Sequence, residues 1–292
     1  MRSPVTRALR AVAAAALTVA SVAGAAATGP AAAAPGDVYV ALGDSFASGP
    51  LIPNQIHLGC TRSDRNYAHV LASRLGAATL RDVTCSGADT RDLTSPQSLS
   101  FLGQDLPPAP PQFDALSADT TLVTITIGGN DTGLIGVAEN CVNALPFGTP
   151  CTRRYIVDGV DTVAARIDAF APAMAAAVQG IRARAPQARI VVTGYGLYIQ
   201  RNGCWPAVPV YPGDANWLQG LVDRLNGVIR TQALANGAEY VDLRTPSAGH
   251  DACRSAGSKW IEGFVPVNVA APLHPNARGE AAYAQIIGDQ IT

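Results

Sequence analysis

Short apolar runs alternate with longer amphipathic stretches along this chain. Five of the short runs are rich in apolar or β-branched residues and end near polar residues or Gly, a pattern that predicts strands at residues 38–42, 78–84, 122–127, 189–193 and 239–243. The second run is the weakest of the five. Stretches with helical periodicity lie between the runs, and this alternation predicts a parallel α/β sheet.

Apolar residues recur at three- and four-residue spacing in several of the longer stretches. This spacing predicts a long helix over residues 158–185, with a kink at Pro172. Asp214 is the expected N-cap of a further helix that ends at Gly237, and Asn276 is the expected N-cap of the last helix. We expect these apolar stripes to face the core rather than a cofactor.

Four irregular segments, rich in Pro and Gly, lie mostly after predicted strands: residues 96–113, 145–154, 200–213 and 246–273. In open α/β sheets, the crevice beyond the carboxyl ends of the strands holds the functional site. The loops carry several large apolar side chains, which suit an apolar ligand: Leu99, Phe101, Trp205, Val208, Tyr211, Trp260 and Phe264.

The N-terminal segment has the three parts of a secretory signal peptide. Arg2, Arg7 and Arg10 precede an Ala-rich apolar run, which ends in small residues suited to cleavage. A permanent membrane anchor is the disfavoured alternative, because the run is mostly Ala. We therefore expect a signal peptide at residues 1–34, a single domain over residues 35–292, and a secreted, extracellular protein.

Charge limits the partners of the mature chain. Removing three Arg from the 21 basic residues, and none of the 22 acidic residues, leaves a net charge of −4. This balance argues against nucleic acid as a partner, and no later segment is long and apolar enough for stable membrane insertion. We expect a monomer.

Six cysteines fit an oxidising compartment. They allow fifteen connectivities, of which the simplest joins neighbours in the sequence: Cys60–Cys85, Cys141–Cys151 and Cys204–Cys253. The sequence has no C-x-x-C, Walker A loop, H-E-x-x-H or complete G-x-G-x-x-G. We therefore expect no metal and no cofactor.

Four segments at or near predicted strand ends carry the groups that acyl transfer needs. Ser45 is the candidate nucleophile, and His274 is the candidate general base and acid. The backbone N–H of Ser45, the backbone N–H of Gly87 and the side-chain amide of Asn130 are candidate oxyanion donors. We expect Asp44 to hold its turn by hydrogen bonds rather than to take part in the chemistry.

These four segments resemble, in order, the four blocks of the SGNH (GDSL) hydrolase family: Gly43-Asp44-Ser45, Gly87, Gly128-Gly129-Asn130-Asp131 and His274-Pro275. The cysteine pairs and the leader further resemble the secreted lipases and esterases of actinobacteria such as Streptomyces. The resemblance implies a three-layer α/β/α sandwich with a flavodoxin-like, doubly wound parallel sheet of about five strands.

The activity that the resemblance implies is hydrolysis of lipid esters through an acyl-serine intermediate, as in a lipase or carboxylesterase. Phospholipase A and carbohydrate acetylesterase activities are alternatives within the same chemistry. A non-catalytic extracellular binding module is a further alternative, and the four intact blocks argue against it.

One position departs from the family pattern. The family usually places an Asp three residues before the histidine, and this chain has Ala271 there. We expect the main-chain carbonyl of Ala271 to orient His274, with Asp242 or Asp251 as alternatives from elsewhere in the chain. His250 is a competitor for the role of base.

Overall fold

A five-stranded parallel sheet organises the computed structural model, which describes residue 1 and residues 37–145 and 147–292. Its strand order is β11-β10-β7-β1-β4. The five strands overlap the five predicted runs: β1 (Val38–Gly43), β4 (Thr79–Asp82), β7 (Thr120–Thr126), β10 (Arg189–Thr193) and β11 (Glu239–Val241). The expected signal peptide lies outside the described residues.

The chain reverses its direction of winding beside β1. This strand pairs with β4 on one side and with β7 on the other, with Val38 opposite Thr79 and Gly43 opposite Thr126. The prediction of a flavodoxin-like, doubly wound sheet is thus confirmed. The crevice at such a reversal, beyond the carboxyl ends of β1 and β7, is where open α/β sheets bind ligands.

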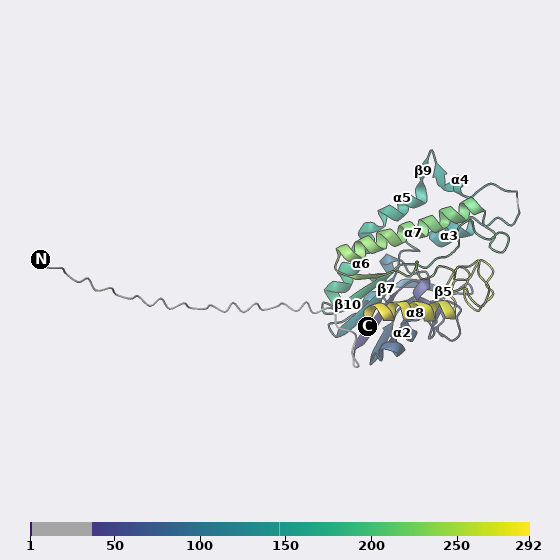
Figure 1. Ribbon diagram of the computed structural model, residues 1–292. Helices are drawn as coiled ribbons and strands as arrows, with labels where there is room; N and C mark the ends of the chain where they lie inside the picture. Colours follow the sequence, from purple (N-terminus) through teal and green to yellow (C-terminus); the bar gives the residue numbers. More distant parts are fainter. Residues whose placement is uncertain (2–36, 146) are drawn as a thin grey trace. The chain divides into compact units, whose positions relative to one another are not determined.

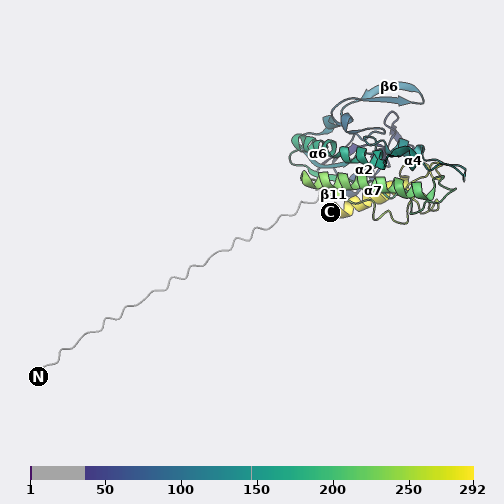
Figure 2. The same ribbon diagram turned by 90° about the horizontal axis from the view of Figure 1, so that it is seen from above.

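Helices cover both faces of the sheet, as Figures 1 and 2 show. The helices α2 (Tyr67–Leu75) and α8 (Ala277–Ile291) pack together on one face. On the other face, α7 (Pro212–Ala235) packs against α5 (Thr162–Ala169) and α6 (Ala171–Arg184). Because both faces are covered, most side chains of β1 and β7 are buried, as expected for parallel strands.

Two helix predictions are wrong in detail. The helix expected over residues 158–185 is interrupted at Phe170, and Pro172 lies in the first turn of α6, where a proline needs no N–H partner. Asp214 does not cap α7, which begins at Pro212; its buried carboxylate instead accepts two backbone N–H groups at the start of α4. Asn276 caps α8, as predicted.

The remaining elements are short and lie in the connections: α1 (Ser45–Ser48), β2 (Gln55–His57), β3 (Arg62–Ser63), η1 (Thr90–Leu93), β5 (Gln97–Phe101), β6 (Gln104–Ala109), η2 (Gln112–Ala115), α3 (Leu134–Glu139), α4 (Thr152–Tyr155), β8 (Ile156–Val157) and β9 (Val160–Asp161). The β5–β6 hairpin falls in a segment that was expected to be irregular. Among the described residues, no helix has both the length and the apolar character needed to cross a membrane.

Three disulfides tie the connections together. They join Cys60 to Cys85, Cys141 to Cys151 and Cys204 to Cys253, which are the pairs expected from the sequence. The first disulfide holds the turn that follows β4, and the third holds the long loop between β11 and α8.

Candidate active site

The turn after β1 presents Ser45 at the start of α1. Gly43 has a φ of 141°, and a Cβ on it would lie 2.5 Å from the carbonyl oxygen of Thr126, so the turn requires glycine there. The side chain of Asp44 caps α1 by accepting the N–H of Phe46, and its own N–H donates to Thr126. These bonds fix the backbone on which Ser45 stands.

Ser45 and His274 meet side chain to side chain across the fold. His274 Nε2 lies 2.7 Å from Ser45 Oγ, and His274 Nδ1 lies 2.7 Å from the carbonyl oxygen of Pro272. When Nδ1–H donates to that carbonyl, Nε2 is left to accept the hydroxyl proton of Ser45. Burial lowers the pKa of His274 below its ordinary value, while the bond to Pro272 opposes that shift.

The carbonyl at the imidazole is not the one expected. It belongs to Pro272, whereas the carbonyl of Ala271 accepts the backbone N–H of His274 at 3.3 Å. Leu273 has a positive φ of 62°, and this sharp bend just before the histidine brings the nearer carbonyl to the ring.

The other candidates for base or acid have partners of their own. The ring of His250 stacks on Trp260 with 4.0 Å between ring centroids, and its Nδ1 lies 2.6 Å from the carbonyl of Ser258. Asp242 accepts the backbone N–H groups two and three residues further along the chain. Asp251 is fully buried and accepts backbone N–H groups from neighbouring loop residues. The imidazole that faces Ser45 is that of His274.

The candidate oxyanion donors come from three neighbouring turns. Gly87 has a φ of 81° in the turn held by Cys85, and the Nδ2 of Asn130 donates to the carbonyl of Ala88 at 2.8 Å. Nδ2 carries two hydrogens, so one remains for a substrate oxygen. Within residues 37–145 and 147–292, the backbone N–H groups of Ser45 and Gly87 have no protein acceptor.

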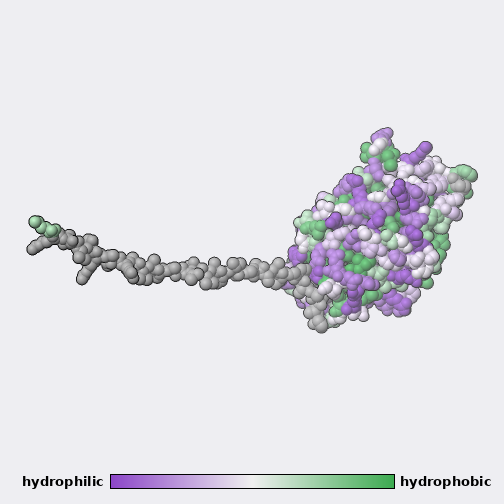
Figure 3. Space-filling model, viewed as in Figure 1, coloured by the Kyte–Doolittle hydropathy of each residue, from purple (hydrophilic) through white to green (hydrophobic). Residues whose placement is uncertain are grey.

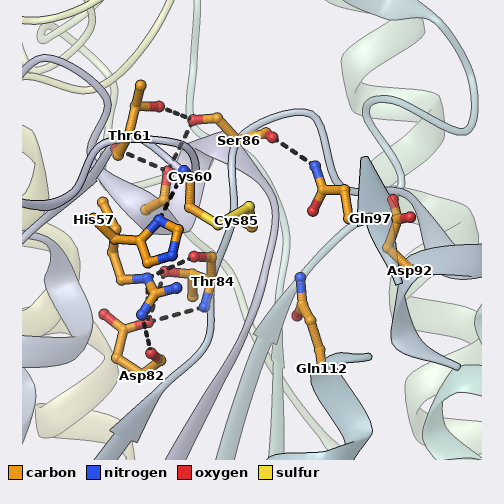
Figure 4. The surroundings of a disulfide bond; sticks show 12 residues. His57, Cys60, Thr61, Asp82, Thr84, Cys85, Ser86, Asp92, Gln97 and Gln112 are labelled. Carbon is orange, nitrogen blue, oxygen red and sulfur yellow. Dashed lines mark hydrogen bonds and ion pairs between the residues drawn. A yellow bond between two sulfur atoms is a disulfide. The ribbon is translucent and has the colours of Figure 1, made fainter. Parts of the chain in front are cut away.

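Two glutamines that were not predicted from the sequence hold these turns in place. Gln97 is 8% exposed, and its Nε2 donates to the carbonyl of Ser86, which belongs to the same peptide unit as the N–H of Gly87 (Figure 4). Gln112 is 2% exposed and bonds to both the N–H and the carbonyl of Gly43. The two residues lie at either end of the segment that contains the β5–β6 hairpin, and no local sequence motif marks them.

Tyr195 links the turn after β1 to the turn after β7. Its hydroxyl donates to Asp44 Oδ2 at 2.5 Å and accepts the N–H of Gly129 at 2.8 Å. Burial raises the pKa of Asp44 to about 7, while the hydrogen bonds from Tyr195 and Phe46 oppose that shift. The residue before Asn130 and the residue before Ser45 are therefore held by one buried side chain.

An apolar cavity opens beside Ser45 and His274. It encloses about 850 Å³ including its open mouth. Helices α3 and α7 and the loops after β10 and β11 supply most of its wall, including Leu134, Ile135, Tyr198, Val210, Leu218, Val222 and Leu273. Of the apolar loop residues expected to suit a ligand, Val208 and Phe264 line it.

The chain matches the GDSL-like lipase/acylhydrolase family over residues 41–282. The chain belongs to this family. It is 39% identical over 257 residues to Lipase 2 of Streptomyces coelicolor, covering 85% of this chain and 83% of that protein. It is 30% identical over 246 residues to a lipase of Streptomyces rimosus, covering 83% of this chain and 82% of that protein.

Two solved structures of Streptomyces enzymes have the same fold. The phospholipase A1 of Streptomyces albidoflavus NA297 superposes with a TM-score of 0.73 at 28% identity, covering 87% of this chain and 99% of that one. The extracellular lipase of Streptomyces rimosus superposes with a TM-score of 0.71 at 27% identity, covering 88% of this chain and 100% of that one. The predicted family and the predicted class, a serine ester hydrolase of the lipase and esterase type, are confirmed.

Proposed function

We propose that this GDSL-family hydrolase cleaves carboxylic esters that carry an apolar acyl chain, with Ser45 as nucleophile and His274 as general base and acid. The observation that carries the proposal is the 2.7 Å contact between Ser45 Oγ and His274 Nε2 beside a cavity with an apolar wall. A serine hydroxyl becomes a nucleophile when a base at this distance takes its proton.

The steps follow from the geometry. Ser45 Oγ attacks the ester carbonyl carbon as His274 Nε2 takes the hydroxyl proton, and the carbonyl oxygen becomes an oxyanion held by the N–H groups of Ser45 and Gly87 and by the Asn130 amide. The intermediate collapses to an acyl-serine, and His274 gives its proton to the departing alcohol. Water then attacks the acyl carbon with His274 again as base, which releases the acid and restores Ser45.

The carbonyl of Pro272 takes the place of a triad carboxylate in this mechanism. As an acceptor for Nδ1–H, it selects the tautomer whose Nε2 faces Ser45. A neutral carbonyl stabilises the imidazolium formed during the reaction less than a carboxylate does, so the oxyanion donors carry a larger share of the stabilisation.

Lipid esters are the proposed substrates. The cavity wall suits a hydrocarbon chain better than a sugar, which supports a lipase over a carbohydrate acetylesterase. A phospholipase A activity is the second candidate, because the phospholipase A1 of Streptomyces albidoflavus shares the fold over nearly its whole length.

Chain-length profiling tests the substrate class. We expect kcat/KM on nitrophenyl esters to rise from acetate to medium and long acyl chains, with Ser45→Ala as the inactive control. Triolein, phosphatidylcholine and acetylated xylan, assayed in parallel, separate the three activities. Maximal activity on acetate and acetylated xylan would contradict the proposal.

A cavity-filling variant sharpens this test. Ala138 on α3 lines the cavity, so Ala138→Phe is expected to lower kcat/KM on long-chain esters by about tenfold or more. Butyrate hydrolysis by the same variant is the internal control and is expected to change much less. An equal loss on both esters would place the acyl chain outside this cavity.

Secretion is part of the proposal. The basic head and apolar run of residues 1–34 and the three disulfides of the domain support export to an oxidising compartment. N-terminal sequencing of protein recovered from culture medium tests it, with a mature N-terminus expected near residue 35. Retention of the full-length chain in the cells would contradict it.

A further inference from the structure

The loop that leads to His274 exposes three of its apolar side chains. We call residues 264–272 the valine loop. Val265, Val267 and Val269 are 78%, 60% and 65% exposed, and the residues between them are partly buried. An exposed apolar patch on a protein surface can mark a site that binds a protein partner or a lipid surface.

The valine loop closes on itself directly at the candidate active site. The N–H of Leu273 donates to the carbonyl of Gly263 at 3.2 Å, and the N–H of Glu262 donates to the carbonyl of His274 at 3.0 Å. Phe264, which begins the loop, and Leu273, which follows it, both line the cavity. Both ends of the valine loop therefore lie at the candidate active site.

The inside of the valine loop is polar and tightly held. Glu262 is fully buried, and its carboxylate accepts the N–H groups of Val267 and Asn268 and the side-chain amides of Asn268 and Asn276. The bonds to the buried Glu262, which precedes the loop, therefore hold the loop in the shape that exposes its three valines.

A fourth exposed apolar side chain lies on the segment that follows the candidate nucleophile. The N–H of Ala271 donates to the carbonyl of Pro50 at 3.0 Å, which brings Leu51 beside the valine loop. Leu51 is 48% exposed and belongs to the segment that follows Ser45. The segments that carry Ser45 and His274 therefore meet at Pro50 and Ala271, and each presents exposed apolar side chains.

We infer that Leu51 and the valine loop form a surface that docks the protein on the surface of a neutral or zwitterionic lipid aggregate, with the cavity mouth facing the lipid. Residues 263–273 contain no charged side chain, so nothing in the loop selects or repels a charged headgroup. Entry of an acyl chain from such a surface into the adjacent cavity exposes little of it to water. The inference rests on the proposed function, because a lipid ester is the substrate that such a surface presents.

Vesicle partitioning tests the inference without catalysis. In a Ser45→Ala background, the triple variant Val265→Ser, Val267→Ser, Val269→Ser is compared with the parent by cosedimentation with phosphatidylcholine vesicles. We expect partitioning to weaken by about ten- to a hundredfold, because three partly inserted apolar side chains lose their favourable transfer from water to lipid.

A matched control uses three exposed apolar residues of the β8–β9 hairpin, namely Ile156, Val157 and Val160, which are 40%, 50% and 58% exposed. In Figure 1 this hairpin lies at the top, across α7 from α8, and Figure 3 shows apolar surface at the same place. Replacing all three with Ser is expected to leave partitioning within about twofold. With Ser45 restored, hydrolysis of soluble nitrophenyl butyrate reports that both variants fold, and the loop variant is expected to stay within about twofold of the parent.

Four results would overturn the inference. The parent protein does not bind the vesicles, the parent and the loop variant bind them equally, or the control variant loses as much binding as the loop variant. In the fourth, the parent is a dimer and the loop variant is a monomer, with no change in vesicle binding. The last result would make the surface a contact between two copies of this chain. Selective loss of partitioning in the loop variant supports the inference. If the loop variant loses partitioning but the active enzyme does not hydrolyse the vesicle lipid, the docking surface is supported and the proposed substrate is refuted.

Discussion

Two histidines of the long C-terminal loop share one feature and differ in another. His250 and His274 each place Nδ1 against a backbone carbonyl, at 2.6 Å and 2.7 Å. The ring of His250 then stacks on Trp260 with 5° between the planes, whereas Nε2 of His274 faces Ser45. A carbonyl at Nδ1 fixes the tautomer in both regions, but only the group that Nε2 faces makes one of them a candidate base.

The largest expected effect is on kcat, and it distinguishes the surroundings of His274 (the His274 region) from those of His250 (the His250 region). Ser45→Ala and His274→Ala are each expected to lower kcat by about 10⁴-fold or more, because either change removes the nucleophile or its base. The measurement is kcat on nitrophenyl butyrate, with circular dichroism to show that the variants fold.

His250→Ala is the matched control for that prediction. It removes an aromatic stack and a hydrogen bond, so the free energy of unfolding is expected to fall by about 1–3 kcal/mol while kcat stays near that of the wild type. An inactive His250→Ala protein that folds, together with an active His274→Ala protein, would exchange the roles of the two regions.

The oxyanion donors give the next largest effect, and it is confined to the His274 region. Asn130→Ala is expected to lower kcat by about 10²–10³-fold, because the amide acts on charge that develops in the transition state. KM is expected to change little. Steady-state kinetics distinguish the two parameters, and a change in KM alone would make Asn130 a substrate-binding residue.

The pH profile reports which state of His274 works. Only the neutral ring accepts a proton, so kcat/KM is expected to fall about tenfold per pH unit below the pKa of His274 and to be flat above it. Because burial lowers this pKa, the inflection is expected below the ordinary value of about 6.5. A carboxylate partner would raise the pKa of His274, so an inflection above that value that belongs to His274 would contradict the carbonyl pairing.

An NMR titration distinguishes the titration of His274 from that of Asp44. The buried Asp44 has a pKa raised to about 7 and lies next to Ser45, so the rate profile alone does not assign the inflection. An NMR titration of the ring proton of His274, assigned by its loss in His274→Ala, gives the imidazole pKa directly. Disagreement between the NMR pKa and the kinetic inflection would assign the kinetic one to another group.

The smallest effect on kcat is expected from substitution of the two aspartates that were alternatives for a triad acid. Asp251 belongs to the His250 region and Asp242 to the turn after β11, so Asp251→Asn and Asp242→Asn are expected to keep kcat within about threefold of the wild type. Loss of a triad aspartate typically costs about 10⁴-fold. A collapse of kcat in either folded variant would show that a side-chain acid supports His274.

The local parts of this molecule could be predicted from the sequence, because each is coded over a few residues. The five strands, the turn at Gly43-Asp44-Ser45 and the Asn276 cap follow from apolar runs, a glycine at a tight turn and an Asx side chain. Ser45 and His274 could be named as candidates because the family blocks mark them, although they are far apart in the sequence.

The parts that could not be predicted depend on contacts between distant segments. Asp214 lies where an N-cap is plausible, but the bond to the backbone of Cys151 gives it a different role. Gln97 and Tyr195 hold the site through hydrogen bonds to other loops, and a lone Gln or Tyr carries no local signal. The choice between the carbonyls of Ala271 and Pro272 depends on one backbone bend that no local pattern predicts.

Labelling with a fluorophosphonate, followed by peptide mass spectrometry, tests most directly whether Ser45 is the acylated residue and whether His274 alone activates it. We expect a single adduct on the peptide that contains Ser45, formed at full rate in His250→Ala and strongly slowed in His274→Ala. An adduct on another residue, such as Ser86 in the neighbouring turn, or unchanged labelling of His274→Ala, would contradict the assignment.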